Sequence, residues 1–97
     1  MTVKVTFDPA KRAATLADRG LDFADAVRLF DGSELTVEDT RFDYPEPRFQ
    51  TYGWLDDRLV MIAWLPDGEA RRVISMRKRN DREQRRLAGA MGRRRSS

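Results

Sequence analysis

The first twenty positions change from an alternating to a helical arrangement of hydrophobic residues. Residues 3–7 alternate between apolar and polar side chains, which predicts a short strand with one buried face. Asp8 suits the N-cap of a helix, and Pro9 suits its first position. We therefore expect a helix over residues 9–18 that is terminated by Gly20.

A second helix is indicated by apolar residues that lie three, four and seven positions after the first of them. Asp22 precedes them as a candidate N-cap, and Gly32 follows them as a stop signal. Such spacing gives an α-helix a single apolar stripe that packs on a core. The stripe consists of Phe23, Ala26, Val27 and Phe30.

The middle of the chain has the short apolar and aromatic runs of β-strands, separated by turn residues. A polar, proline-bearing loop is expected over residues 39–47, and turns are expected at residues 56–57 and 66–68. Residues 59–64 are almost continuously apolar, which places their strand in the middle of an antiparallel meander. The predicted strands cover residues 35–38, 48–55, 58–65 and 70–78.

A capping-box pattern near residue 80 predicts a third helix. Asn80 is its candidate N-cap, and Glu83 occupies the third helical position. The helix has a small apolar face and a basic face. The basic face consists of Arg82, Arg85 and Arg86.

The length of 97 residues leaves room for one compact domain. We expect residues 1–92 to form that domain and residues 93–97 to be a disordered basic tail, because charged termini without apolar residues seldom fold. The predicted class is α+β, with a small antiparallel sheet and the element order β-α-α-β-β-β-β-α.

Cysteine and histidine are both absent from the chain. The first absence excludes disulfides and thiolate metal sites, and the second removes the usual general base at neutral pH. Ser-His, Cys-His and zinc mechanisms are thereby excluded, so catalysis would have to use Arg, Lys, carboxylates or hydroxyls. No signal-peptide core is seen, and no stretch approaches the roughly 18 apolar residues of a membrane span. We therefore expect a cytoplasmic protein.

Charge is divided unevenly along the chain. Residues 1–70 carry 8 Lys/Arg and 14 Asp/Glu, whereas residues 71–97 carry 11 Lys/Arg and 2 Asp/Glu. A concentrated basic segment favours a polyanionic partner such as a nucleic acid, because phosphate contacts dominate such binding. The alternative is a solvated helix face with a charged tail, and charge alone does not choose between the two.

Four short motifs follow one another along almost the whole chain. They are F-D-P-A-K at residues 7–11, the helix pattern at residues 21–31, E-P-R at residues 46–48 with Gly53, and R-V-I-S-M-R-K at residues 72–78 with Glu83. They are similar to F/W-D-x-x-K, V-x-F-E-E-A-x-x-V-F-x-D, E-x-R-x-x-x-x-G and R-I-I-S-A-R-K followed by E in the BrnT family of RelE-like toxins. The chain departs from that family in lacking its T-x-R near the last strand and its Tyr after the late Glu.

The resemblance implies a RelE-like ribonuclease toxin of a type II toxin–antitoxin system. It implies RNA cleavage without a metal or other cofactor, by attack of a ribose 2′-hydroxyl on the adjacent phosphate, and hence inhibition of translation. It also implies neutralisation by a BrnA-like antitoxin with a ribbon-helix-helix DNA-binding domain, contact with operator DNA only through that antitoxin, and no membrane association. The alternative is a non-catalytic nucleic-acid-binding or antitoxin-binding module on the same fold.

Arginine suits this reaction because a guanidinium holds two phosphate oxygens at once and neutralises the charge of the transition state. The candidate catalytic residues are Arg48, Arg72, Arg77 and Glu83, and the candidate substrate-binding residues are Lys11, Lys78, Arg82 and Arg85. Strand alternation puts Arg72 and Arg77 on opposite faces of their strand. On that basis the strand alone does not bring all of these arginines into one site.

Several candidates also have structural explanations. Arg72 can pair with a carboxylate such as Glu46 instead of binding substrate. A glutamate at position 83 has a backbone-capping role, and surrounding arginines would oppose the raised pKa that a general base needs. Aromatic residues on the strands can stack on bases, but packing in the sheet is their more common role. These aromatic residues are Tyr52, Trp54 and Trp64.

Overall fold

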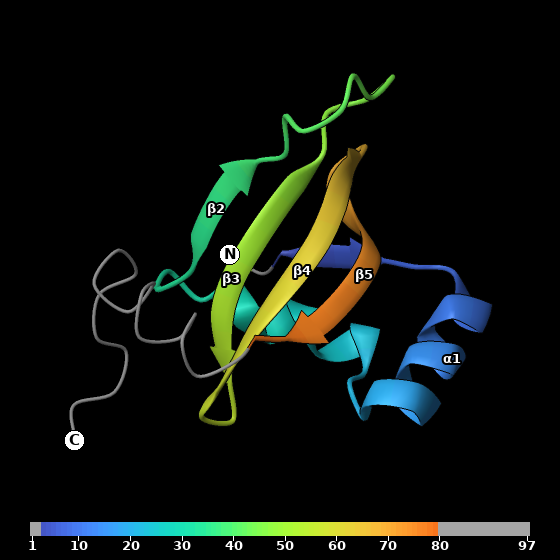
Figure 1. Cartoon of the computed structure of the whole chain (residues 1–97), viewed down its shortest axis with the longest axis vertical. Coiled ribbons are helices and arrows are strands. Elements are labelled where there is room, and N and C mark those ends of the chain that lie inside the picture. Colours follow the sequence, from blue (N-terminus) through green and yellow to red (C-terminus); the bar gives the residue numbers. More distant parts are fainter. Residues whose placement is uncertain (1–2, 80–97) are drawn as a thin grey trace.

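The computed structural model describes residues 3–79 and shows a mixed five-stranded sheet with one α-helix and one 3₁₀ helix (Figure 1). The strands lie in the order β1-β5-β4-β3-β2. The elements are β1 (Lys4–Thr6), α1 (Pro9–Arg19), η1 (Phe23–Leu29), β2 (Leu35–Glu38), β3 (Phe49–Leu55), β4 (Arg58–Asp67) and β5 (Ala70–Lys78). Helix η1 crosses one face of the sheet, and α1 lies beside β5 (Figure 1). The α+β class is therefore confirmed.

Strands β2 to β5 agree with the predicted ones to within two residues at each end. The predicted third helix and the tail at residues 93–97 lie outside the described residues, and so do Arg82, Glu83 and Arg85. Among residues 3–79, no helix has both the length and the apolar content needed to cross a membrane.

Helix α1 begins and ends at the predicted signals. The Asp8 carboxylate accepts a hydrogen bond from the Ala10 amide at 2.9 Å, and Gly20 adopts a left-handed conformation with a φ of 70°. No residue of α1 is buried, so polar contacts contribute much of its attachment to the fold. One of these contacts is the hydrogen bond that Arg19 Nη1 donates to the Met76 carbonyl oxygen at 2.9 Å.

An ion pair joins α1 to the start of η1. Arg12 donates to both carboxylate oxygens of Asp22, at 2.7 and 2.9 Å. Asp22 also accepts a hydrogen bond from the Ala24 amide at 2.9 Å as the N-cap of η1. The hydrogen bond from Arg12 contributes most to lowering the pKa of Asp22 to about 2, and the hydrogen bond from Ala24 contributes next. The folded protein therefore favours the ionised form of this side chain.

We expect this ion pair to make stability depend on acid pH. Because the pKa of Asp22 in the folded protein lies below its ordinary value of 3.8, its stabilisation is complete above that value and is lost as the pH falls towards about 2. Asp22→Asn keeps an N-cap acceptor but removes the charge. Its free energy of unfolding, measured by urea denaturation at a series of pH values, should therefore fall less steeply over this interval than that of the wild type.

The control for this experiment is Glu69→Gln, which removes the same charge from an exposed position in the β4–β5 turn. The slope of stability against pH should be shallower for Asp22→Asn than for Glu69→Gln. Equal slopes for the two variants would contradict the prediction.

Helix η1 differs from the α-helix that the sequence predicts. It is a 3₁₀ helix whose buried residues are Phe23, Ala26 and Leu29. Burial every third position forms one line only when a helix has about three residues per turn. Val27, expected in the apolar stripe, is only half-buried, and Phe30 forms the C-cap and packs at the edge of the core. The predicted spacing was therefore wrong, although the helix packs on the core as expected.

The hydrophobic core lies between η1 and the sheet. The central strand β4 is buried on both faces, as predicted from its continuous apolar run. Val60 and Ile62 belong to the core cluster with η1. Leu59 and Met61 are also buried and alternate with them, so they lie on the opposite face.

The sheet is not purely antiparallel, which corrects the sequence prediction. Strand β1 pairs with β5 in parallel, with Val5 opposite Arg71. Parallel neighbours need a long connection, and the whole of the chain from α1 to β4 separates these two strands. The sequence shows the strands but does not reveal this pairing.

A β-bulge in β5 interrupts the alternation that the sequence predicts. Ala63 on β4 pairs with Ser75, but the next residue, Trp64, pairs with Val73. Ile74 is therefore an extra residue with no partner directly across the β4–β5 ladder. Residues on either side of it no longer follow one alternating pattern.

The bulge moves Arg72 onto the same face of the sheet as Arg77. Arg72 pairs with Leu65 and Arg77 pairs with Met61, and these two β4 residues share one face because they are four positions apart. Val73 lies in the core on the other face. The prediction that the two arginines face opposite sides was wrong because it assumed an uninterrupted strand.

Candidate functional site

The face of the sheet opposite η1, called here the open face although Leu59 and Met61 of β4 are buried on it, carries three rows of residues that run from β3 through β4 to β5. The strand register fixes the middle row and the third row. Arg48 immediately precedes β3, and continuing the β3–β4 register by one residue places it next to Leu65 in the first row. Its carbonyl accepts a hydrogen bond from the Asp39 amide at 2.8 Å, which extends the β2–β3 ladder by one position. The rows are Arg48, Leu65 and Arg72, then Gln50, Ala63 and Ser75, then Tyr52, Met61 and Arg77.

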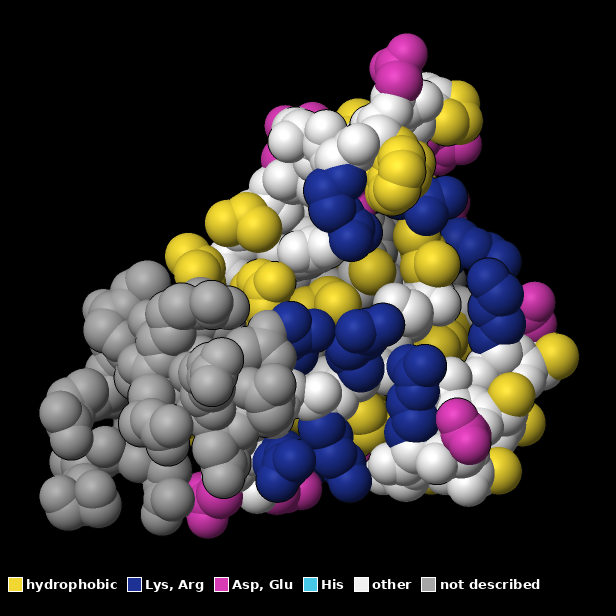
Figure 2. Space-filling view, viewed as in Figure 1, with side chains coloured by type: hydrophobic (Ala, Val, Ile, Leu, Met, Phe, Trp, Pro, Cys, Tyr) yellow, Lys and Arg dark blue, Asp and Glu magenta, His cyan; other side chains and the backbone are white. Residues whose placement is uncertain are grey.

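Lys and Arg side chains gather over the middle of the open face, while Asp and Glu side chains lie mainly around its margin (Figure 2). Arg72 and Arg77 are exposed, and Arg48 is half-buried. None of these three arginines has a carboxylate within 4.0 Å among residues 3–79. The pairing of Arg72 with Glu46 that the sequence allows does not form. The three cations therefore lie on one side of the sheet without carboxylate partners among residues 3–79, and two of them, Arg72 and Arg77, are exposed to solvent.

The middle row between these arginines is small and polar. Ala63 lies at its centre, with Gln50 and Ser75 on either side. The Tyr52 hydroxyl donates a hydrogen bond to Gln50 Oε1 at 3.1 Å. Neighbouring strands are about 4.8 Å apart and alternate residues of a strand about 6.6 Å apart, so long side chains from both flanking rows can extend over the middle row. The small side chains of the middle row leave space for a phosphate group between the arginines of the first row and Arg77 of the third row.

The loop between β2 and β3 holds Arg48 in place. The Arg48 guanidinium carbon lies 4.5 Å from the centroid of the Tyr44 ring, which is a cation–π contact. The Tyr44 hydroxyl in turn donates to the Asp39 carboxylate at 3.1 Å. Sequence reasoning treated residues 39–47 as a polar loop and missed this support, because its contacts join side chains that share no periodic spacing.

Asp39 organises this loop. Arg41 donates to its two carboxylate oxygens at 2.9 and 2.8 Å, and the Arg41 amide donates at 3.1 Å. The hydrogen bond from the Arg41 side chain is the main cause that holds the pKa of Asp39 well below its ordinary value. The Asp39 side chain is only 5% exposed, so the loop closes around a buried carboxylate.

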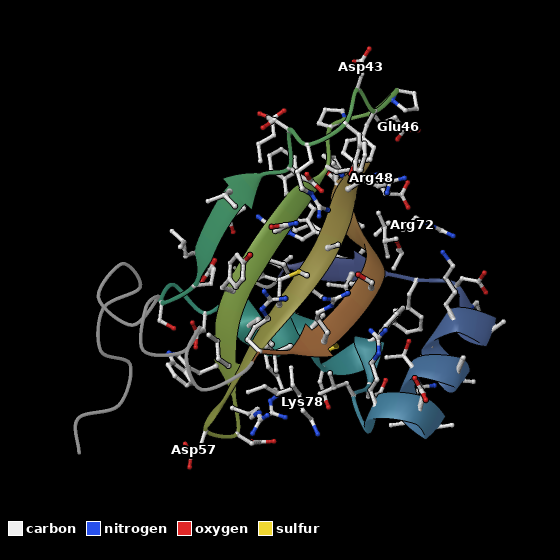
Figure 3. The ribbon with its side chains drawn as sticks, viewed as in Figure 1. Asp43, Glu46, Arg48, Asp57, Arg72 and Lys78 are labelled. Carbon is white, nitrogen blue, oxygen red and sulfur yellow. The ribbon has the colours of Figure 1, made fainter. Side chains whose placement is uncertain are left out.

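The other predicted substrate-binding residues lie elsewhere. Figure 3 shows Arg48 and Arg72 towards one end of the sheet and Lys78 at the opposite end. Lys78 follows Arg77 on β5 and therefore faces the side of η1. Lys11 is exposed on α1. The structure brings Arg48, Arg72 and Arg77 together on the open face, but it does not bring Lys11 or Lys78 to them.

Trp64 and Arg71 belong to the core side of the sheet. Trp64 is 7% exposed, and its Nε1 donates to the Thr51 hydroxyl at 2.8 Å. The Arg71 guanidinium carbon lies 4.3 Å from the Phe30 ring centroid and 4.5 Å from that of Trp64. Packing is therefore the confirmed role of Trp64. Tyr52, in contrast, lies on the open face beside the candidate site.

Within the described part of the chain, no group of three or more His, Cys, Asp or Glu residues is arranged to hold a metal ion.

Comparison with known proteins identifies the family to which the chain belongs. A search of curated proteins gives no match. The family model for the ribonuclease toxin BrnT of type II toxin–antitoxin systems matches residues 7–83, a region that includes every arginine of the three rows. The four motifs and this match agree, and the chain belongs to the BrnT family of ribonuclease toxins.

Proposed function

We propose that this protein cleaves RNA on the open face of its sheet, with the scissile phosphate over the middle row. The observation that supports this proposal most strongly is the bulge in β5, which puts Arg72 and Arg77 on one face with Ser75 between them. Arg48 approaches the same position from the other end of the first row. A phosphate over Ala63 would therefore meet guanidinium groups on several sides.

In the proposed reaction, a ribose 2′-hydroxyl attacks the adjacent phosphorus and the bond from phosphorus to the 5′-oxygen of the next nucleotide breaks. The products are a 2′,3′-cyclic phosphate and a 5′-hydroxyl, and the proton lost by the 2′-hydroxyl balances the one gained by the leaving oxygen. Negative charge grows on the phosphoryl oxygens in the transition state. Arginines fixed around those oxygens stabilise that charge and align the attacking group. No metal takes part in the proposed reaction.

Two hydroxyl groups lie beside the proposed phosphate position. Ser75 belongs to the middle row, and Tyr52 belongs to the third row. We propose that they orient the ribose and the phosphate by hydrogen bonds. Glu83, the general base proposed from the sequence, lies outside the described residues, and its role rests on the sequence motif alone.

The type II toxin family implies an antitoxin partner. We propose that the antitoxin neutralises this protein by covering the open face with an acidic surface, which would match the charge of the arginines and exclude RNA. We propose a BrnA-like antitoxin whose ribbon-helix-helix domain binds operator DNA, so that this chain contacts DNA only indirectly. In this proposal the toxin acts in the cytoplasm and reduces translation by destroying RNA.

The decisive test is RNA cleavage by the purified protein in EDTA, with and without the product of the neighbouring gene. We expect shortened RNA with cyclic-phosphate ends in the absence of the partner and intact RNA in its presence. Expression of this protein alone should arrest growth, and co-expression of the partner should relieve the arrest. Intact RNA and unimpaired growth at high expression would overturn the proposal. Salt-sensitive binding without cleavage would identify a non-catalytic nucleic-acid-binding module instead.

A further inference from the structure

The loop between β2 and β3, residues 39–48, presents an aromatic ring to solvent. Phe42 is 67% exposed, more than any other large hydrophobic residue among residues 3–79. Its ring contacts the Tyr44 ring edge-on, with centroids 5.7 Å apart, and the Arg41 guanidinium carbon lies 5.7 Å from its centroid. Phe42 is therefore supported from the side of the loop and leaves much of its surface uncovered.

Hydrogen bonds support this ring indirectly, through the two side chains that contact it. Arg41 and Tyr44, the two residues that contact Phe42, are both bonded to the buried Asp39 carboxylate. Side-chain hydrogen bonds to Asp39 therefore hold the loop together, although residues 39–47 contribute no buried hydrophobic side chain. An exposed aromatic ring supported by two anchored side chains is a platform on which a flat group can stack.

The loop is continuous with the proposed active site. It borders a concavity of about 540 Å³ lined by residues 38–48, and Arg48 of the first row is one of the lining residues. The side chain of Arg48 also stacks on Tyr44. A strand of RNA with one phosphate at the first row would therefore have its next base near the loop.

Charge distinguishes the loop from the arginine rows. Asp43 and Glu46 line the concavity, and Figure 3 shows them on the loop beyond Arg48. Carboxylates repel phosphates, but they accept hydrogen bonds from the amino groups of nucleobases. The basic open face therefore suits the RNA backbone, whereas the aromatic and acidic loop suits a base.

We propose that the β2–β3 loop is a base-binding element, in which an unpaired RNA base stacks on Phe42 while the neighbouring phosphates lie on the arginines of the open face. This inference rests on the proposed ribonuclease function. It assigns Phe42 a role in binding and in the choice of cleavage position. Tyr44 and Asp39 are positioning residues that hold the ring and Arg48.

The test measures binding of an uncleavable RNA oligonucleotide, with 2′-O-methyl groups at every position, by fluorescence anisotropy. Phe42→Ala should weaken this binding about tenfold, as expected for the loss of one base–aromatic stack. It should leave unchanged the binding of an abasic oligonucleotide of the same length and the salt dependence of binding, because phosphate contacts persist. Phe42→Trp should restore affinity, and its fluorescence should be quenched by the base-bearing oligonucleotide.

Leu16→Ala is the matched control, because Leu16 is a 43% exposed hydrophobic residue on α1. It should bind both oligonucleotides like the wild type. Equal weakening of both oligonucleotides by Phe42→Ala, or no weakening, would overturn the inference, as would a Phe42→Ala defect confined to antitoxin binding. If the wild type cleaves RNA and Phe42→Ala cleaves it at unchanged positions, only this inference fails. If the wild type neither binds nor cleaves RNA, the proposed function itself fails.

Discussion

Arg77→Ala should lower kcat/KM for RNA cleavage by about a hundredfold, the loss expected when one fixed partner of a developing phosphoryl charge is removed. Arg77 is exposed in the third row and has no carboxylate partner among the described residues, so the fold does not depend on it. The melting temperature should therefore stay close to that of the wild type. Cleavage of a fluorescent RNA in EDTA gives the rate.

Two further variants separate local from general electrostatic effects. Arg77→Lys keeps the charge but not the two-pronged geometry, so it should recover only part of the activity. Arg58→Ala removes the same charge from an exposed residue that pairs with buried Leu55 and therefore lies outside the open face. It should cleave RNA at nearly the wild-type rate. A loss as large as that of Arg77→Ala would mean that net charge, and not a site on the open face, governs activity.

The arginine site shows where sequence patterns stop being informative. The motif at residues 72–78 directs attention to Arg72 and Arg77, and its identification needs only the residue types. Their common orientation depends on one extra residue, Ile74, which the pairing of β5 with β4 accommodates as a bulge. Nothing in the local sequence marks that position, because a bulge is a property of two strands together.

The fold divides in the same way. Capping by Asp8, the end of α1 at Gly20 and the strands of the meander follow from local signals and are confirmed. The parallel pairing of β1 with β5 depends on contacts between distant segments, and the 3₁₀ form of η1 depends on how its buried residues meet the sheet. The conformation of the β2–β3 loop likewise depends on contacts that no periodic sequence pattern reveals. Asp39 binds Arg41 and Tyr44, and Tyr44 supports Arg48 across the loop.

Gly53 belongs to the motif that begins with E-P-R at residues 46–48. The packing of η1 on β3 explains why this position is a glycine. It is buried in β3 and faces Leu29, which is 1% exposed. A β-carbon at position 53 would lie 3.1 Å from Leu29 Cγ and 3.2 Å from Leu29 Cβ, closer than ordinary carbon contacts. Leu29 cannot easily move away because it is enclosed in the core by the sheet and its own short helix. A glycine therefore lets η1 approach the sheet closely.

Gly53→Ala should lower the free energy of unfolding by about 1 to 3 kcal/mol, the usual cost of adding a methyl group to a filled core. The better strand propensity of alanine works in the opposite direction, but it is worth less than the overpacking. Leu29→Ala should cost about 2 to 5 kcal/mol by leaving a cavity, and the added methyl group at position 53 would fill part of it. The double variant should therefore be more stable than the sum of the two single losses predicts, by urea denaturation. Wild-type stability of Gly53→Ala, or strict additivity in the double variant, would show that η1 and β3 are not in close contact at this position.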